Sequence, residues 1–394
     1  MRESASGNGW TDVAFGDVVQ LSREGSSDPE EDGFERYVGL EHLEPGDLKI
    51  RRWGQVTDGT TFTNVFHAGQ VLFGKRRAYQ RKVAVADFDG VCSGDLYVLG
   101  PRNDQLLPDL LPFICQTDRF FEHAVGTSAG SLSPRTNWES LAEYEFTLPP
   151  LAEQRRIADV LENAKALCDS LASLGEACTQ AHSCASAREF NALRPSSASV
   201  SLASICSRRP QSGIYKSEEF RGRGVPMVNM GELFGNDVID GAVAMERIDL
   251  DDRELERYGL TPNDLLFGRR SVVLEGAGRC VLVGDVTGPV VFESSVLRVT
   301  IDDSLADSRY VFEWLRSPYG VQQIKRIVTF TTVSGVAGSD VARLPVPFPT
   351  LEVQKGVADR LSGLRSQIGE PRERLAACTR LSSLIAATLL GSCT

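Results

Sequence analysis

The feature that most constrains this chain is a sequence segment that occurs twice. Residues 149 to 161 read Pro-Pro-Leu-Ala-Glu-Gln-Arg-Arg-Ile-Ala-Asp-Val-Leu, and residues 349 to 361 read Pro-Thr-Leu-Glu-Val-Gln-Lys-Gly-Val-Ala-Asp-Arg-Leu. The offset of two hundred residues is about half of the 394-residue chain. A pattern matched in order at such an offset indicates that one structural unit is used twice. We therefore expect two similar domains and a site with two parts.

The segments ahead of this repeat also correspond in order. Gly69 to Arg77 contains Val-Leu-Phe-Gly-Lys-Arg-Arg, and Asn263 to Arg270 contains Leu-Leu-Phe-Gly-Arg-Arg. A Ser-Gly before a strand-like run at 93 to 99 corresponds to a Ser-Ser before the run at 296 to 299. These matches indicate that the duplication covers most of the chain.

The composition indicates a globular protein with more than one core. At 394 residues and 42% hydrophobic residues, the chain exceeds what one core usually serves. The N-terminus has no apolar signal segment and no window approaches eighteen consecutive apolar residues, so we expect a soluble, cytoplasmic protein without a membrane segment. The nine cysteines show no metal-ligand spacing, which favours reduced, packed thiols and no metal site.

The net charge of -11 argues at first against a nucleic-acid partner, but the charges are unevenly distributed. Residues 59 to 86 contain no acid and carry Lys75, Arg76, Arg77, Arg81 and Lys82. Residues 314 to 339 also contain no acid and carry Lys325 and Arg326. Phosphate binding depends on the local basic surface, so DNA remains a compatible partner. The alternative is that these runs are ordinary solvated faces.

Each half of the chain reads as a globular unit followed by a long helix. Short β-prone runs occupy 10 to 148 and 200 to 348, with single helices expected at 107 to 124 and 307 to 327. Prolines then precede two long amphipathic helices, and Gly369-Glu370-Pro371 should break or kink the second. The apolar residues expected at the helix seams are Ile157, Val160, Ala164, Leu167, Leu171, Leu174, Cys178, Ala181 and Ala185, and then Val357, Leu361, Leu364, Ile368, Leu375, Cys378, Ile385 and Leu389.

A helix with one apolar stripe is not stable alone in water, so we expect the two seams to bury each other. A helix of ~35 residues spans ~50 Å at 1.5 Å per residue. Paired antiparallel, the two helices would form a coiled coil and act as a spacer between the globular units. The predicted fold class is α+β, with two tandem similar domains that are each followed by a long helix.

The search for catalytic motifs is largely negative. His42, His67, His123 and His182 are scattered, and neither a nucleophile elbow nor a phosphate-binding glycine loop is present. Small-residue loops at 126 to 131 and 335 to 339 could cradle phosphates or be plain flexible turns. We therefore favour a binding protein without catalytic residues, cofactor or metal over an enzyme.

Two units that each end in Pro-x-Leu and a glutamine at the start of a long helix resemble the DNA specificity subunit of type I restriction-modification systems. Pro150 to Ala158 carries the stronger match, while Glu352-Val353-Gln354 departs from the usual adjacent Glu-Gln. The resemblance implies target-recognition domains at 1–149 and 195–348, and spacer helices at 150–194 and 349–394. It also implies a non-catalytic subunit that recognises a bipartite, asymmetric double-stranded DNA target in antiviral defence.

The implied partners are DNA methyltransferase subunits, two of them, and restriction/translocase subunits. For docking these partners we single out charged and polar residues at the helix starts, namely Glu153, Gln154, Arg155, Arg156, Gln354 and Lys355. For DNA we single out basic residues that follow the Leu-Phe-Gly strands or lie in the other acid-free segments. They are Lys75, Arg76, Arg77, Arg81, Lys82, Arg135, Arg269, Arg270, Lys325 and Arg326.

Two other functions remain open from sequence. The chain could be the specificity subunit of a different defence or modification system with the same architecture. It could also be a scaffold whose two domains bind proteins and not DNA. The scaffold alternative predicts no salt-dependent binding to duplex DNA.

Overall fold

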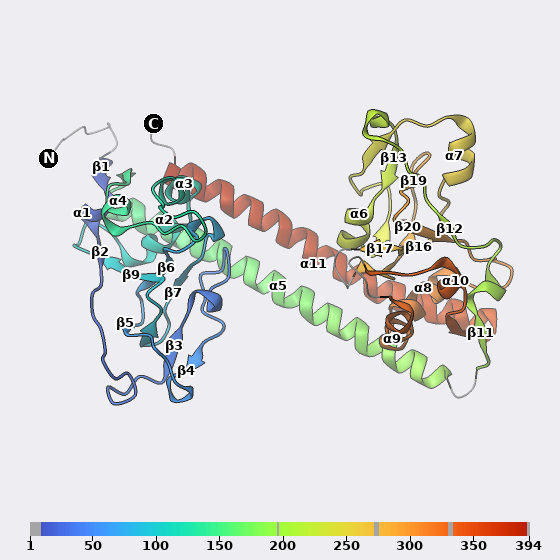
Figure 1. Ribbon diagram of the computed structural model, residues 1–394, viewed down its shortest axis with the longest axis horizontal. Helices are drawn as coiled ribbons and strands as arrows, with labels where there is room; N and C mark the ends of the chain where they lie inside the picture. Colours follow the sequence, from blue (N-terminus) through green and yellow to red (C-terminus); the bar gives the residue numbers. More distant parts are fainter. Residues whose placement is uncertain (1–8, 195–196, 272–275, 330–333, 392–394) are drawn as a thin grey trace. The chain divides into compact units, whose positions relative to one another are not determined.

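The computed structural model describes residues 9–194, 197–271, 276–329 and 334–391 (Figure 1). The chain forms two compact units: Met1–Leu171 with Glu373–Thr394 is unit 1, and Ala172–Arg372 is unit 2. Two long helices, α5 (Leu151–Leu193) and α11 (Leu351–Gly391), each contribute one segment to either unit. Both units mix helices with sheets, so the predicted α+β class is confirmed.

The globular part of unit 1 contains two four-stranded sheets and one strand pair. The first sheet has the order β2-β9-β6-β7 and is antiparallel throughout. The second has the order β4-β3-β8-β5, with β3 and β8 parallel, and β1 pairs with β10. The strands are β1 (Thr11–Ala14), β2 (Val19–Leu21), β3 (Arg36–Val38), β4 (Gly54–Gln55), β5 (Asn64–Phe66), β6 (Val71–Gly74), β7 (Val83–Val85), β8 (Gly90–Cys92), β9 (Leu96–Pro101) and β10 (Glu145–Leu148).

Strand β6 is central to unit 1 because both of its faces are buried. Val71 and Phe73 pack in one apolar cluster with the helices, and Leu72 packs in a second cluster on the opposite face. This is the period of two expected of a strand whose sequence is an unbroken apolar run. The helices are α1 (Phe15–Val18), η1 (Leu40–His42), η2 (Val56–Asp58), η3 (Ala78–Gln80), η4 (Pro108–Leu110), α2 (Leu111–Gln116), α3 (Asp118–Gly126) and α4 (Trp138–Ala142).

Unit 2 repeats this plan with the sheet β12-β20-β16-β18-β14, a three-stranded sheet β15-β13-β19, and the pairs β17-β21 and β11-β22. Leu265 and Phe267 of β16 face one cluster and Leu266 faces another, as in β6. The strands are β11 (Ser199–Ser201), β12 (Gln211–Ser212), β13 (Arg221–Val228), β14 (Val238–Ile239), β15 (Glu246–Ile248), β16 (Leu265–Gly268), β17 (Arg270–Ser271), β18 (Cys280–Val283), β19 (Val291–Phe292), β20 (Val296–Val299), β21 (Ser334–Gly335) and β22 (Pro345–Pro347).

The helices of unit 2 show why one sequence expectation fails in both halves. A single helix is expected at 107–124 and at 307–327, but each is interrupted, at Thr117 and at Ser317. Both residues have extended backbones, and their hydroxyls accept hydrogen bonds from Phe120 N and Gly320 N, which starts a new helix. The remaining unit 2 helices are η5 (Leu202–Ile205), η6 (Glu218–Phe220), α6 (Met230–Gly235), α7 (Asp252–Tyr258), α8 (Ser308–Arg316), α9 (Pro318–Ile327) and α10 (Gly338–Ala342).

The long helices pair antiparallel within each unit, which confirms the predicted pairing. In unit 1 the sulfur atoms of Cys168 and Cys378 lie 2.8 Å apart, and Ile385 joins the cluster that contains Leu161. In unit 2 the Arg360 guanidinium lies 2.9 Å from both oxygens of Glu189. In both units, therefore, residues later in α5 lie beside residues earlier in α11.

The seam of α5 differs from the sequence expectation. Ile157, Ala164, Leu171, Cys178 and Ala185 are at least half-buried, as expected. The alternate members of the expected seam are exposed, and the residues one position later take their places. The exposed residues are Val160, Leu167, Leu174 and Ala181, and the seam residues that replace them are Leu161, Cys168, Gly175 and His182.

Both sets keep the three/four spacing, so the period alone cannot choose between them. Packing against the partner helix α11 determines which of the two sets is buried. On α11, every expected seam residue whose side chain the structure describes is buried or half-buried; the side chain of Leu389 lies outside the described residues.

The expected break at Pro371 is wrong. Helix α11 continues from Leu351 to Gly391 with Pro371 inside it. Pro371 is buried at the seam, and a Cβ built on Gly175 of α5 would lie 3.9 Å from the Pro371 Cβ. An interior proline costs one backbone hydrogen bond, and here packing against the partner helix offsets that cost.

One cation on each long helix ties the helix to the acids of its own unit. Lys165 Nζ lies 2.9 Å from Asp169 and 3.4 Å from Asp47. Two hundred residues later, Arg365 binds Glu313 at 2.7 Å and 2.8 Å and Asp237 at 3.0 Å. Across the described ranges, no helix has the length and apolar character needed to cross a membrane, and no three metal-ligand side chains gather.

Candidate nucleic-acid interface

The two Leu-Phe-Gly strands end in the same backbone arrangement. Gly74 at the end of β6 pairs with Leu96, and Gly268 at the end of β16 pairs with Val296. The next two amides then donate to one carbonyl in each unit. Lys75 N and Arg76 N reach Asp95 O at 3.1 Å and 3.5 Å, and Arg269 N and Arg270 N reach Ser295 O at 2.7 Å and 3.3 Å. The basic turns predicted from sequence are therefore equivalent in structure.

In unit 1, the Asp95 carboxylate organises the arginines of this turn. One oxygen accepts from Arg76 Nη1 at 3.0 Å, and the other accepts from Arg135 at 2.9 Å and 3.1 Å. Arg76 Nε also donates to Ser133 Oγ at 2.6 Å. Burial by itself raises the pKa of Asp95, but the hydrogen bonds from the two arginines outweigh burial and the pKa is lowered. Asp95 is therefore an anion that positions two cations.

The other basic residues of this segment differ in the contacts that their side chains make. Lys75 lies 4.6 Å from the Tyr97 ring centroid, and its pKa is lowered, mainly by burial. Lys82 donates to Leu40 O at 2.9 Å, and Arg81 pairs with Asp118 at 2.6 Å. Arg77 has a left-handed backbone, with φ of 54°, and its N–H donates to Pro134 O.

The Arg77 side chain faces a cleft in unit 1. Its Nε is buried and has no hydrogen-bond partner within the part of the chain that the structure describes. The cleft has a volume of about 270 Å³ and contains three cations and two acids. Its lining residues are Leu40, Glu41, Arg76, Arg77, Gln80, Lys82, Ser93 and Asp95.

The corresponding turn in unit 2 has no carboxylate at its centre, because Ser295 stands where unit 1 has Asp95. Arg270 is exposed, and Arg269 Nη1 reaches Ser294 O at 3.4 Å. Among the described residues, neither arginine makes an ion pair. Lys325 and Arg326 lie on α9 and are exposed. The two units thus present the same basic turn with different local charge.

The glutamines of the repeated segment, which we singled out for partner docking, are buried. Gln154 is 1% exposed and Gln354 is 0% exposed. The Gln154 amide accepts from Leu107 N and donates to Gln105 O and Pro149 O. The Gln354 amide accepts from Asp307 N and donates to Pro349 O. Each glutamine therefore ties the start of a long helix to its own globular part.

The other four partner-binding candidates surround these glutamines. Arg155, Arg156 and Lys355 are exposed, and Glu153 is half-buried. Arg156 donates to both oxygens of Glu153, at 2.6 Å and 2.8 Å.

Comparison with known proteins relates this architecture to one family. Residues 7–174 match the family model described as the type I restriction modification DNA specificity domain. The specificity subunit of the Escherichia coli type I restriction enzyme EcoDI is 28% identical over 173 residues, which cover 42% of this chain and 36% of that subunit. The specificity subunit of the MjaVIII enzyme from Methanocaldococcus jannaschii is 21% identical over 394 residues, 91% of this chain and 87% of that subunit. Residues 7–174 of this chain are thus similar to the specificity domain of type I systems, and the chain spans about a third of the EcoDI subunit.

Two solved structures have the same fold as this chain over nearly its whole length. The S subunit of a type I system from M. genitalium covers 99% of this chain and 98% of its own, with a TM-score of 0.64 and 14% identity. A chain from a study of assembly and conformational transition of the type I R-M system covers 97% of both chains, with a TM-score of 0.50 and 18% identity.

The structure adds residues to the candidate interface that the sequence did not single out. Tyr79 is 55% exposed within the 75–82 segment, where an aromatic side chain among cations suits base stacking. Leu132 is 91% exposed on the loop that carries Ser133 and Arg135. The alternation of basic and aromatic residues could have indicated Tyr79, whereas the exposure of Leu132 requires the structure.

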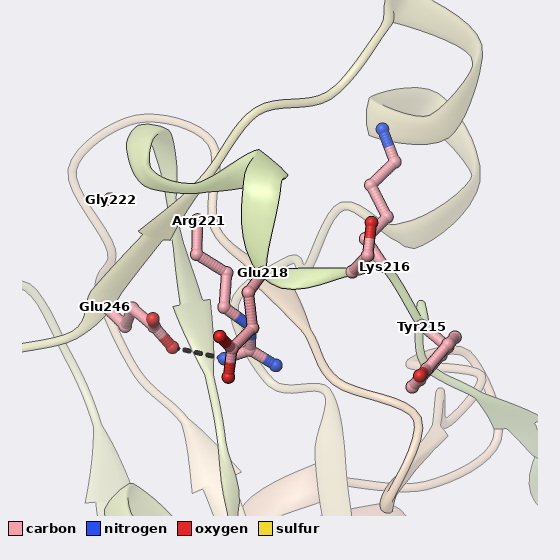
Figure 2. Close-up of a pocket in the computed structure, with 7 residues that line it drawn as sticks. Tyr215, Lys216, Glu218, Arg221, Gly222 and Glu246 are labelled. Carbon is pink, nitrogen blue, oxygen red and sulfur yellow. Dashed lines mark hydrogen bonds and ion pairs between the residues drawn. The ribbon is translucent and has the colours of Figure 1, made fainter.

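A pocket in unit 2 was also not indicated by the sequence. It has a volume of about 580 Å³ and lies beside β13 and β15 (Figure 2). Arg221 on its wall pairs with Glu246, and Lys216 pairs with Glu254 at 2.6 Å. Because these cations are neutralised, the pocket is polar but lacks the unpaired positive charge of the Arg269–Arg270 turn. Tyr215 at its margin is 83% exposed.

Proposed function

We propose that this chain is the non-catalytic subunit that gives a type I restriction-modification complex its DNA sequence specificity. Each globular part binds one half of a bipartite, asymmetric duplex target. The long helices hold the methyltransferase subunits, two of them, and through these the restriction/translocase subunits. The complex acts in the cytoplasm, on DNA that lacks the host's modification.

One observation carries this proposal: the same basic turn recurs at the end of a buried strand in both units, fixed by the same backbone hydrogen bonds. Arginines at a strand end can reach phosphates or pair bidentately with guanine. Two equivalent turns with different neighbours, Asp95 in one and Ser295 in the other, suit a target whose halves have different sequences. The names of the related proteins agree with this role.

The first test concerns charge in unit 1. Replacing Lys75, Arg76 and Arg77 together with alanine should weaken binding to duplex DNA and flatten its salt dependence. The slope of log K against log salt should fall by ~0.9 for each phosphate that the variant no longer neutralises. Fluorescence anisotropy of a labelled duplex, measured at several salt concentrations, gives the slope.

A matched control is available in the same unit. Arg102 is exposed and follows the end of β9 opposite to Asp95, about 20 Å away at ~3.3 Å per residue. Arg102→Ala should leave the slope unchanged. If the triple variant keeps the wild-type slope, the unit 1 turn is not part of the interface. If the wild-type protein binds no duplex at any salt concentration, the proposal of DNA binding is wrong and the scaffold alternative is favoured.

We also propose where the methyltransferase subunits dock. Val160, Leu167 and Leu174 are exposed at seven-residue intervals on α5, so they form an apolar stripe beside the seam. Arg155 and Arg156 lie on the same helix, one turn before Val160. An apolar stripe with charged residues near it suits a protein partner more than DNA.

Leu167→Glu should reduce recovery of the methyltransferase subunit in co-purification while leaving the chain folded. Ala166→Glu is the control, because Ala166 is also exposed but points about 100° away around the helix. Equal recovery with both variants would remove the stripe from the docking surface.

A further inference from the structure

The loop at residues 128–136 in unit 1 is built as a braced projection. Ala129 and Arg135 exchange two backbone hydrogen bonds, each 3.0 Å long, which close its base. The loop is then attached to the basic turn by two more bonds, from Arg77 N to Pro134 O at 2.7 Å and from Thr136 N to Lys75 O at 3.0 Å. The base of the loop and the 75–77 turn therefore form one rigid piece of backbone.

The tip of this loop presents a leucine to solvent. Leu132 is 91% exposed, the most exposed large apolar side chain among the described residues. Its neighbours Ser131 and Ser133 are small, and Gly130 has φ of 112°, a conformation that favours glycine. A single exposed leucine needs no explanation in general. Here, however, it projects from a loop whose base carries Arg135 and is bonded to the turn that carries Arg76 and Arg77.

Asp95 joins the two sides of this structure. It binds Arg76 on the turn and Arg135 on the loop through different carboxylate oxygens, so it holds both guanidinium groups in fixed places. Arg76, Arg77 and Arg135 against one aspartate still leave the site positively charged. In unit 2 the equivalent position is Ser295, which cannot brace arginines in this way.

We propose that Leu132 contacts the bases of duplex DNA and that Asp95 is the positioning residue that holds Arg76 and Arg135 for this contact. This inference rests on the proposed function and deepens it. The arginines bind phosphate or guanine, while the leucine contacts a thymine methyl group or wedges against a base step. One half of the target is then read by a loop that Asp95 braces. Unit 2 has no carboxylate at the position that corresponds to Asp95.

The experiment is selection from a randomised duplex library by the full-length chain in complex with its methyltransferase subunits. Three variants are compared with wild type: Leu132→Ala, Asp95→Ser, which copies unit 2, and Arg270→Ala, which marks the half-site read by unit 2. Leu305→Ala is the control, because Leu305 is 44% exposed in unit 2 and away from both turns in sequence.

For Leu132→Ala we expect one half-site to lose its preference at one or two positions by about tenfold, while the half-site altered by Arg270→Ala stays unchanged. The salt slope should not change, since the substitution removes no charge. For Asp95→Ser we expect the same half-site to weaken while affinity for non-target duplex holds or rises, because a negative charge is removed.

Two results would overturn this inference but leave the proposed function standing. One is that wild type and Leu132→Ala select the same split motif with equal affinity. The other is that Asp95→Ser lowers target and non-target affinity together, with a lower melting temperature, which would make Asp95 purely structural. A wild-type complex that selects no motif would overturn the proposed function and this inference with it.

Discussion

Among single residues, Glu313 shows most clearly how burial and charge are balanced in this protein. It lies on α8, is 1% exposed, and binds Arg365 of α11 through both oxygens. His182 of α5 lies 3.2 Å away. Burial by itself raises the pKa of Glu313, but the contacts from Arg365 and His182 outweigh burial and hold the pKa below its ordinary value of 4.5. Glu313 thus joins both long helices to the globular part of unit 2.

We predict that Glu313→Gln destabilises unit 2 by about 3 kcal/mol at pH 7, because the buried Arg365 guanidinium loses one of its two carboxylate partners. A carboxylate with a lowered pKa stabilises the fold above pH 4.5 and loses this effect as the pH falls through the lowered pKa. The difference between variant and wild type should therefore shrink in acid. Hydrogen exchange of the α8 amides in the full-length chain, at pH 7 and near pH 4, measures it; a difference that does not depend on pH would contradict the assignment.

At the scale of elements, the sequence indicates strands more reliably than helix faces. The Leu-Phe-Gly strands expected from the sequence are β6 and β16, because a strand buried on both faces needs an unbroken apolar run. The predicted seam of α5 is wrong at alternate positions, because the helix carries two sets of residues with three/four spacing. The helix breaks at Thr117 and Ser317 depend on local capping, which the apolar period does not reveal.

The site is less predictable than the fold. Arg76 and Arg135 are indicated by their charge, but Asp95, which brings them together, is distant from both in sequence. Its role arises only when β9 pairs with β6. The burial of Gln154 and Gln354 is likewise a tertiary effect, because a polar residue near a helix start usually faces solvent.

The register of the helix pair predicts a chemical cross-link. The sulfur atoms of Cys168 on α5 and Cys378 on α11 lie 2.8 Å apart in unit 1. Oxidation of the two thiols by diamide, which takes up their two electrons and two protons, should form an intramolecular disulfide. A mobility shift on non-reducing gels and a joined peptide in mass spectrometry would detect it. Cys168→Ser should abolish the shift; a wild-type chain that cross-links other cysteines first would show a different register.

At the scale of the whole molecule, the chain has two units of similar plan, and each long helix contributes a segment to both. Both α5 and α11 run through the boundary between the units. Gln154 and Gln354, and the cations Lys165 and Arg365, fix each helix to its own globular part at positions two hundred residues apart. The helices are therefore suited to set the separation of two half-sites.

This proposal predicts the effect of lengthening the helices. Inserting one heptad within 164–181 and a matching one within 375–389 adds ~10 Å to both helices and preserves the seam. The spacing between half-sites should grow by about three base pairs at ~3.4 Å each, with unchanged half-site sequences. An insertion in α5 alone should disrupt the pairing. Altered half-site sequences at unaltered spacing would show that the helices do not set the distance.

We propose that this chain selects a split DNA target, with one half read by each unit. The most direct measurement is a genome-wide map of DNA methylation in cells that carry the methyltransferase with the wild-type chain, with Arg270→Ala, or with no chain. We predict methylation at one motif with two half-sites and a fixed gap, loss of this methylation without the chain, and a change in only one half-site for Arg270→Ala. Methylation that persists without the chain, or a continuous motif with no gap, would contradict this proposed role.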